Sequence, residues 1–219
     1  MPVRIAVVDY HKGNLSSVVR GLDRAGADAF TTDEPEAIAA ADGLVIPGVG
    51  AFYDAITFMR EHGQDEAIVA AVAVGEPLLG ICLGLQLLFE RGDEGVPAED
   101  GRWVQGLGLL RGSCTRLEST RLKVPHVGWD QVHMTPAGAA DPLLTGFAEG
   151  ANMYFTHSYA VADDFDEADV LARTHYTRSF PCIVRKGNAW GCQFHPEKSS
   201  ALGQLILKNF VAIVEEARA

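Results

Sequence analysis

The chain has 219 residues, a mass of 23.5 kDa and a formal net charge of −11. With 47% apolar and 21% charged residues, it can bury one substantial core, and without a Pro- or Ser-rich linker we expect a single domain over residues 1–219. Its acidic balance, with no Lys/Arg cluster, argues against a nucleic-acid partner, which requires a basic surface.

The first half of the chain alternates β-branched apolar runs with helical periodicity. Leu15, Val18, Val19 and Leu22 recur at i, i+3, i+4 and i+7, which indicates a helix that ends near Gly26. The predicted elements are strands over residues 4–8, 27–32, 43–46 and 77–81 and helices over 15–26, 35–41, 67–74 and 83–90. This βαβ rhythm predicts a parallel sheet covered by helices.

The second half has shorter strands and more turns. A Gly-, Asp- and Glu-rich surface loop is predicted over residues 91–108, followed by strands over 109–117, 128–133, 152–161, 170–173, 182–185 and 189–193. Lys186-Gly187-Asn188 turns the last two strands into a hairpin, and a helix follows Ser199-Ser200, which are N-cap residue types. We therefore expect an α/β, flavodoxin-like fold: an open, mostly parallel central sheet flanked by helices, with antiparallel hairpins added in the second half.

The sequence has no predicted membrane-spanning segment or signal peptide and no cysteine pattern typical of disulfides. No window approaches about 18 consecutive apolar residues, and the N-terminal apolar run is too short for a signal peptide. The four cysteines are irregularly spaced, without Cys-x-x-Cys pairs: Cys82, Cys114, Cys182 and Cys192. We expect reduced thiols in a soluble, cytoplasmic protein that does not bind membranes.

The sharpest chemical signal is Gly80-Ile81-Cys82-Leu83-Gly84, at the junction of a predicted strand and helix. Gly-x-Cys-x-Gly is the thiol form of a nucleophile elbow, in which flanking glycines permit a tight, strained turn. The helix N-terminus favours the thiolate over the thiol. The alternative is that Cys82 is a small buried apolar residue before a helix.

A base for such a thiol is available in Gln193-Phe194-His195-Pro196-Glu197, at the end of the last predicted strand. Strand ends are where α/β sheets gather their active sites, and Glu197 can fix the tautomer of His195 as the acid of a triad does. The alternative is a strand-end histidine with a solvated neighbour. His-x-Glu also occurs in zinc deaminases, but their Pro-Cys-x-x-Cys segment after the histidine is missing, so no metal site is expected.

The strand end Pro47-Gly48-Val49-Gly50 has two readings besides a plain strand-to-helix turn. It lacks the third glycine of a dinucleotide fingerprint and any Gly-Lys-Ser/Thr, which argues against nucleotide binding. It can instead present backbone N–H groups to an oxyanion, beside the N–H of Leu83.

The combination of Gly80–Gln86 and Phe194–Glu197 resembles the paired signature of class I, triad-type glutamine amidotransferases. Within that class, the chain is similar over its whole length to the glutaminase subunits of imidazole glycerol phosphate synthase. Five further segments carry this similarity: residues 9–10 with 13–18, 47–52, 125–129, 154–159 and 195–199.

The resemblance implies hydrolysis of L-glutamine to glutamate and ammonia, without a cofactor. Ammonia would pass to a (β/α)₈ cyclase subunit, forming a heterodimer that makes imidazole glycerol phosphate and AICAR in histidine biosynthesis. It also assigns roles by position: Cys82, His195 and Glu197 as the catalytic triad, and Gly48, Val49, Gly50, Leu83 and Gln86 as oxyanion and substrate-binding residues.

By the same resemblance, six residues would face the partner: Asn14, Ser17, Pro125, Trp129, Tyr154 and Lys198. The family usually has glycine where His11 stands, which is a departure close to this interface. Three alternatives stay open at this point: a glutaminase that serves anthranilate synthase, one that serves GMP synthetase, and a non-catalytic subunit that retains the fold.

Overall fold

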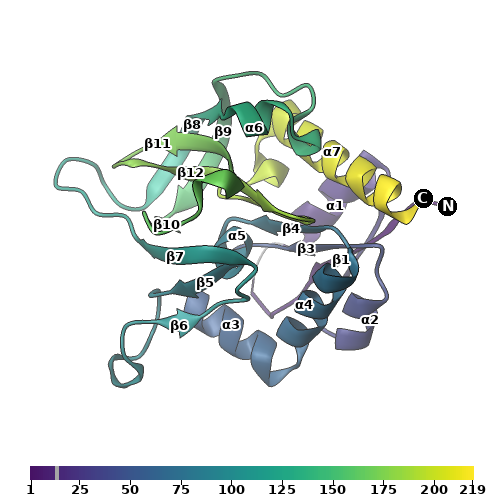
Figure 1. Cartoon of the computed structure of the whole chain (residues 1–219), viewed down its shortest axis with the longest axis horizontal. Coiled ribbons are helices and arrows are strands. Elements are labelled where there is room, and N and C mark those ends of the chain that lie inside the picture. The colour runs from purple at the N-terminus through teal and green to yellow at the C-terminus, as the bar shows by residue number, and fades with distance from the viewer. Residues whose placement is uncertain (13–14) are drawn as a thin grey trace.

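The computed structural model describes residues 1–12 and 15–219, so the predicted interface residue Asn14 lies outside the described residues. Within them, nine strands form one sheet in the order β2-β1-β3-β4-β13-β12-β11-β8-β9 (Figure 1). In that order the strands are Asp28–Thr32, Arg4–Val8, Gly43–Ile46, Leu78–Ile81, Ala189–Cys192, Ser179–Lys186, Val170–His175, His126–Met134 and Ala151–His157.

The sheet has a parallel part and an antiparallel part. Strands β2, β1, β3, β4 and β13 pair in parallel, whereas β12, β11, β8 and β9 extend the sheet by antiparallel pairing. A second sheet, in the order β10-β7-β5-β6, lies to one side of the first; its strands are Tyr159–Val161, Leu110–Arg116, Phe89–Gly92 and Val104–Gln105. The α/β architecture and the late antiparallel hairpins were thus predicted.

Helices cover both faces of the parallel part, as Figure 1 shows, with α1 and α7 on one face and α2, α3 and α4 on the other. The helices are α1 Leu15–Ala25, α2 Pro35–Ala39, α3 Phe52–Glu61, α4 Gln64–Val74, α5 Leu83–Leu87, α6 Pro136–Ala139 and α7 Ser200–Arg218. Strand β1 has a period of two: Ile5 and Val7 pack in the cluster of α1 and α7, and Ala6 and Val8 in the opposite cluster. Because both faces are covered, the strand is apolar from Ile5 to Val8.

Several elements differ from the sequence-based expectation, among them strand β6 inside the predicted surface loop and helix α6, neither of which was predicted. The helix Phe52–Glu61 was not predicted. The helix expected over residues 83–90 ends at Leu87, because Phe89–Gly92 pairs with β7 as strand β5. The strand expected over residues 152–161 breaks at Ser158 into β9 and β10, which belong to different sheets.

Candidate active site

The turn between β4 and α5 carries Cys82 in a backbone conformation that L-residues rarely adopt, with φ +53° and ψ −103°. The two flanking glycines approach neighbouring backbone closely. A Cβ on Gly84 would lie 2.0 Å from the carbonyl oxygen of Ile46, and one on Gly80 would lie 2.5 Å from that of Gly84. The tight, strained turn that the motif predicted is therefore present, and no larger residue fits on either side of Cys82.

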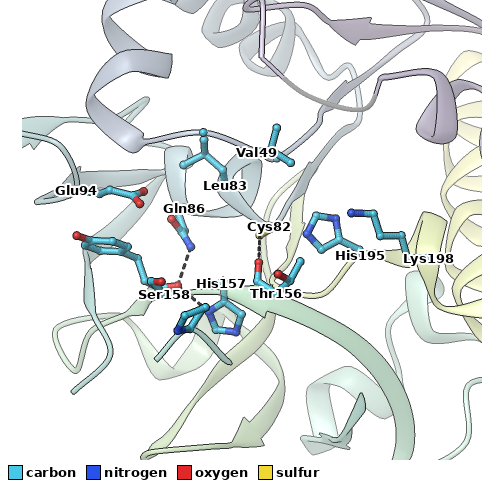
Figure 2. A pocket seen from close by; sticks show the side chains of 14 residues that line it. Val49, Cys82, Leu83, Gln86, Glu94, Thr156, His157, Ser158, His195 and Lys198 are labelled. Carbon is cyan, nitrogen blue, oxygen red and sulfur yellow. Dashed lines mark hydrogen bonds between the residues drawn. The ribbon is translucent and has the colours of Figure 1, made fainter. Parts of the chain in front are cut away.

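Cys82 opens into a cavity of about 450 Å³. Figure 2 shows His195 and Lys198 on one side of Cys82 and Gln86 with Glu94 on the other. The cavity is lined by Gly48, Val49, Gly50, Cys82, Leu83, Gln86, Glu94, Pro125, Thr156, His157, Ser158, Tyr159, His195 and Lys198. The sulfur and the imidazole, 113 residues apart in sequence (195 − 82), are thus brought to one cavity.

His195 follows β13 and is held by backbone contacts on both sides. Its N–H donates to the carbonyl of Tyr154 at 2.9 Å, and its own carbonyl accepts from the Ser199 hydroxyl at 2.7 Å. The Ser199 oxygen also accepts from the Tyr154 N–H at 3.0 Å, so Ser199 holds this loop in place. The sequence suggested that Ser199 caps α7, but its side chain makes no capping hydrogen bond. The base is therefore fixed against strand β9.

Glu197 orients the ring of His195. The carboxylate Oε1 lies 2.8 Å from Nδ1, and both side chains are almost fully buried. With Nδ1–H donating to Glu197, Nε2 is left without a hydrogen-bond partner among the described residues. Burial by itself lowers the pKa of His195, but the Cys82 sulfur and the Glu197 carboxylate outweigh it and raise that pKa to about 9. The imidazolium form is thus stabilised beside the thiol.

The strand end Gly48–Gly50 lies directly against the nucleophile turn. A Cβ on Gly48 would be 2.3 Å from the backbone nitrogen of Leu83, so the two candidate oxyanion segments are adjacent. The Val49 N–H, however, donates to the hydroxyl of Tyr10 at 3.3 Å, and that hydroxyl donates to the Pro47 carbonyl at 2.6 Å. Tyr10 is buried, and burial raises its pKa, so it remains a neutral phenol. Sequence reasoning did not identify this residue.

The other end of the cavity carries polar groups that suit a substrate amine. Gln86 uses its Nε2 to donate to the Tyr159 carbonyl at 2.8 Å, which leaves its Oε1 to accept, and Figure 2 shows this oxygen on the side of Glu94. Burial raises the pKa of Glu94 to about 7. The Phe52 N–H, which donates to Oε2 of Glu94 at 3.2 Å, partly opposes this rise. Glu94 fell in the predicted surface loop, where the sequence offered no signal for it.

His157 lines the cavity and lies against a second buried histidine, His126, that is outside the lining. His157 Nδ1 lies 2.8 Å from the Tyr159 carbonyl, so Nδ1 must donate, and Nε2 lies 3.2 Å from Nδ1 of His126. Burial lowers the pKa of His157 to about 3, so the ring stays neutral. Neither histidine had been assigned to a site from the sequence.

Five of the six expected interface residues are in the described part of the chain. Pro125 and Lys198 line the cavity, and Trp129 and Tyr154 face each other across β8 and β9 with ring centroids 5.9 Å apart. Trp129 is 54% exposed, which is unusual for tryptophan. Ser17 lies on α1 and accepts from Arg20 at 3.0 Å, outside the cavity lining. Across residues 1–12 and 15–219, no group of three or more His, Cys, Asp or Glu side chains is arranged to hold a metal ion.

Hydropathy adds one further observation: none of the helices in the described part of the chain is long and apolar enough to span a bilayer.

The family model of class I glutamine amidotransferases matches residues 6–214. Among solved structures, the PurLQS structure from Thermotoga maritima has a TM-score of 0.72 at 19% identity, with 100% of both chains covered. A crystal structure of a glutamine amidotransferase has a TM-score of 0.71 at 19% identity and covers 96% of this chain and 98% of the other. These neighbours confirm the fold.

Three curated relatives named imidazole glycerol phosphate synthase subunit HisH are much more similar in sequence. The protein from Halalkalibacterium halodurans is 43% identical over 97% of both chains. The protein from Moorella thermoacetica is 45% identical over 97% of this chain and 96% of its own, and that from Natronomonas pharaonis 46% over 94% and 93%. The chain therefore belongs to the class I glutamine amidotransferases and, within them, to the HisH-type glutaminase subunits of imidazole glycerol phosphate synthase.

Proposed function

We propose that this HisH-type glutaminase hydrolyses L-glutamine with Cys82 as nucleophile, His195 as acid and base, and Glu197 as the orienting carboxylate. The observation that carries the proposal is the cavity shared by Cys82 and His195. In it, the strained Cys82 and the Nε2 of His195, which has no hydrogen-bond partner among the described residues, are both available to a substrate. A non-catalytic subunit would have no use for a strained cysteine opposite an oriented imidazole.

The reaction follows the thioester route. The Cys82 thiolate attacks the carboxamide carbon, and the tetrahedral oxyanion accepts from Leu83 N–H and from the Val49–Gly50 segment next to Gly48. His195 Nε2–H then protonates the amide nitrogen of the tetrahedral intermediate, the C–N bond breaks, and ammonia leaves the Cys82 thioester. The neutral ring next removes a proton from water, which attacks the thioester and releases glutamate. Throughout, Glu197 accepts from Nδ1–H and stabilises the imidazolium form.

Substrate orientation is assigned to the opposite end of the cavity. The α-ammonium of glutamine is a donor, and the acceptors available there are the Glu94 carboxylate and the Oε1 of Gln86. A charged pair in a half-buried site fixes the amino end and leaves the carboxamide over Cys82. Gln86 therefore takes part in binding, as the sequence resemblance suggested, and Glu94 joins it.

The ammonia acceptor is the (β/α)₈ cyclase subunit of the synthase, in a cytoplasmic heterodimer. The aromatic pair of exposed Trp129 and half-buried Tyr154, together with Pro125 and Lys198 from the cavity lining, has the aromatic character of an interface centre. Ser17 and Asn14 extend the proposed contact along the chain. Ammonia released at Cys82 would then leave the cavity toward the partner.

The triad assignment is tested with the chain bound to its cyclase partner. We expect Cys82→Ala to abolish glutamate release, and a glutamine-analogue electrophile to label Cys82 of the wild-type protein stoichiometrically. Glutamate production that survives Cys82→Ala would mean that the nucleophile has been wrongly assigned.

The interface is tested separately by affinity. Trp129→Ala should weaken binding of the cyclase subunit tenfold or more, since buried tryptophan anchors typically contribute about 2 kcal/mol or more to an interface. Trp103→Ala is the control, because Trp103 packs against Arg91 and Arg102 at the second sheet, away from the cavity. Equal affinities of both variants and the wild type would remove Trp129 from the interface.

A further inference from the structure

Strand register places Gln193 beside Cys82. Strands β4 and β13 run in parallel with Ile81 opposite Cys192, and the Cys82 N–H donates to the Cys192 carbonyl at 2.7 Å. Gln193 directly follows the end of β13 and is fully buried, with its Nε2 3.6 Å from the Cys82 sulfur. A neutral amide buried in an apolar core carries a desolvation cost unless its polar atoms are bonded. The Nε2 of this amide forms its hydrogen bond with the sulfur of Cys82, the candidate nucleophile.

The orientation of the Gln193 amide follows from the Tyr159 carbonyl, to which Gln193 is connected through the side chain of Gln86. The Tyr159 carbonyl can only accept, so the nitrogen of Gln86 must face it. The same Gln86 nitrogen lies 3.2 Å from Oε1 of Gln193, and this contact fixes the oxygen end of Gln193. The N–H end of Gln193 is therefore the end that points to the sulfur of Cys82.

We propose that Gln193 is a positioning residue for the reaction, which donates an N–H hydrogen bond to the Cys82 thiolate and holds the sulfur at the cavity. The inference rests on the proposed role of Cys82 as nucleophile and adds a group that stabilises its reactive form. A thiolate shut off from most water needs a donor, and a hydrogen bond to an ionised acceptor is stronger than one between neutral groups.

The other cysteines provide a comparison within the same fold. Cys114, Cys182 and Cys192 are buried more completely than Cys82, and burial raises the pKa of all three thiols. As neutral thiols, Cys114 donates to the Gln86 carbonyl and Cys82 to the Thr156 carbonyl at 3.9 Å. Among the cysteines, which all lie in the described part of the chain, the sulfur of Cys82 is the one that accepts from a side-chain N–H. The donor is thus specific to the thiol that must ionise.

The test is the pH dependence of alkylation of Cys82 by iodoacetamide in the full chain, followed by peptide mass mapping. Gln193→Met keeps the volume but removes the N–H, and Gln193→Glu keeps an oxygen for Gln86 but places a carboxylate near the sulfur. We expect the alkylation midpoint to move up by about one pH unit in Gln193→Met and further in Gln193→Glu, because a hydrogen bond to a charged group is lost.

Two controls separate positioning from general destabilisation. Gln204→Met removes a half-buried amide that donates to the Gly21 carbonyl, and it should leave the midpoint unchanged. If Gln193→Met or Gln193→Glu does not fold, Gln193→Asn is used in its place, because it keeps an amide but draws it back from the sulfur by one methylene. An unshifted midpoint in the folded Gln193 variants overturns the inference. If Cys82→Ala still abolishes glutamate release, that result leaves the nucleophile assignment standing; if it does not, the proposed function itself has failed.

Discussion

At the scale of single residues, the chemistry depends on how Cys82 and His195 share charge. The interaction with the Cys82 sulfur is the largest effect that raises the pKa of His195 to about 9 against the opposing effect of burial. We expect Cys82→Ala to lower this pKa by at least about one unit, as measured by NMR titration of the imidazole. A pKa that stays near 9 in the variant would assign the shift to Glu197 alone.

The same shift has a consequence for stability. Because the pKa of His195 is higher in the folded chain than its ordinary value of 6.5, its contribution is complete below about pH 6.5 and is lost as the pH rises through about 9. In Cys82→Ala, this loss should still begin near pH 6.5 but should be complete at a lower pH, since the folded-state pKa is reduced.

Glu94 should give the glutaminase a second ionisation near neutral pH. Its carboxyl, with a pKa raised by burial to about 7, is neutral below that pH and then cannot pair with the substrate ammonium. We expect kcat/KM to fall as the pH drops through about 7, and Glu94→Gln to remove this inflection. The variant should raise KM roughly tenfold to hundredfold with little change in kcat, as expected for loss of a charged hydrogen bond of about 1.5–3 kcal/mol. A wild-type pH profile in Glu94→Gln would contradict this role.

Residues differ in how far the sequence reveals them. Cys82, His195 and Glu197 were predicted because glycines and a proline mark the turns that hold them. Tyr10, Glu94 and Gln193 were not assigned roles, since each reaches the site from a segment whose approach depends on tertiary packing. Their partners lie 37 or more positions away: Pro47 for Tyr10, Phe52 for Glu94 and Cys82 for Gln193.

At the scale of elements, the Pro47–Gly50 segment is held by Tyr10, at the end of β1. The Val49 N–H donates to the Tyr10 hydroxyl and is therefore not free to donate to the oxyanion, as the proposed mechanism requires. We expect Tyr10→Phe to free this N–H and to raise the basal glutaminase rate of the isolated chain about fivefold, for a hydrogen bond of about 1 kcal/mol. Glutamate release without partner is the measurement.

The matched control for this change is Tyr53→Phe. The Tyr53 hydroxyl donates to Asp100 at the surface and touches no part of the cavity, so the basal rate should not move. A basal rate that falls in Tyr10→Phe would mean that the hydroxyl holds the segment ready for catalysis.

The elements that position the site could be predicted where strands are buried on both faces. Strands β1, β3 and β4 are continuous apolar runs, and their lengths are close to those expected. The end of α5 could not be predicted, because Leu87, Leu88 and Phe89 are all apolar and buried. Only the pairing of Phe89 with Leu110 in a second sheet makes this residue a strand.

At the scale of the whole molecule, two apolar clusters share one sheet. Alternate residues of β1 belong to opposite clusters, so neither cluster can dissolve without disturbing the strands of the other. We therefore expect one cooperative unfolding transition, with coincident curves from far-UV circular dichroism and from tryptophan fluorescence. Two separated transitions would contradict the single domain over residues 1–219.

Coupling to the partner is the property that involves the entire assembly. In the free chain, the Val49 N–H is bonded to Tyr10, so the oxyanion lacks one of its proposed donors. Removing one such donor typically lowers kcat about 10²- to 10³-fold. We expect the isolated chain to release glutamate at least about a hundredfold more slowly than the heterodimer loaded with its ribonucleotide. Glutamate is measured for the chain alone, with the cyclase subunit, and with both ligands; equal turnover in all three would show that the free site is already assembled.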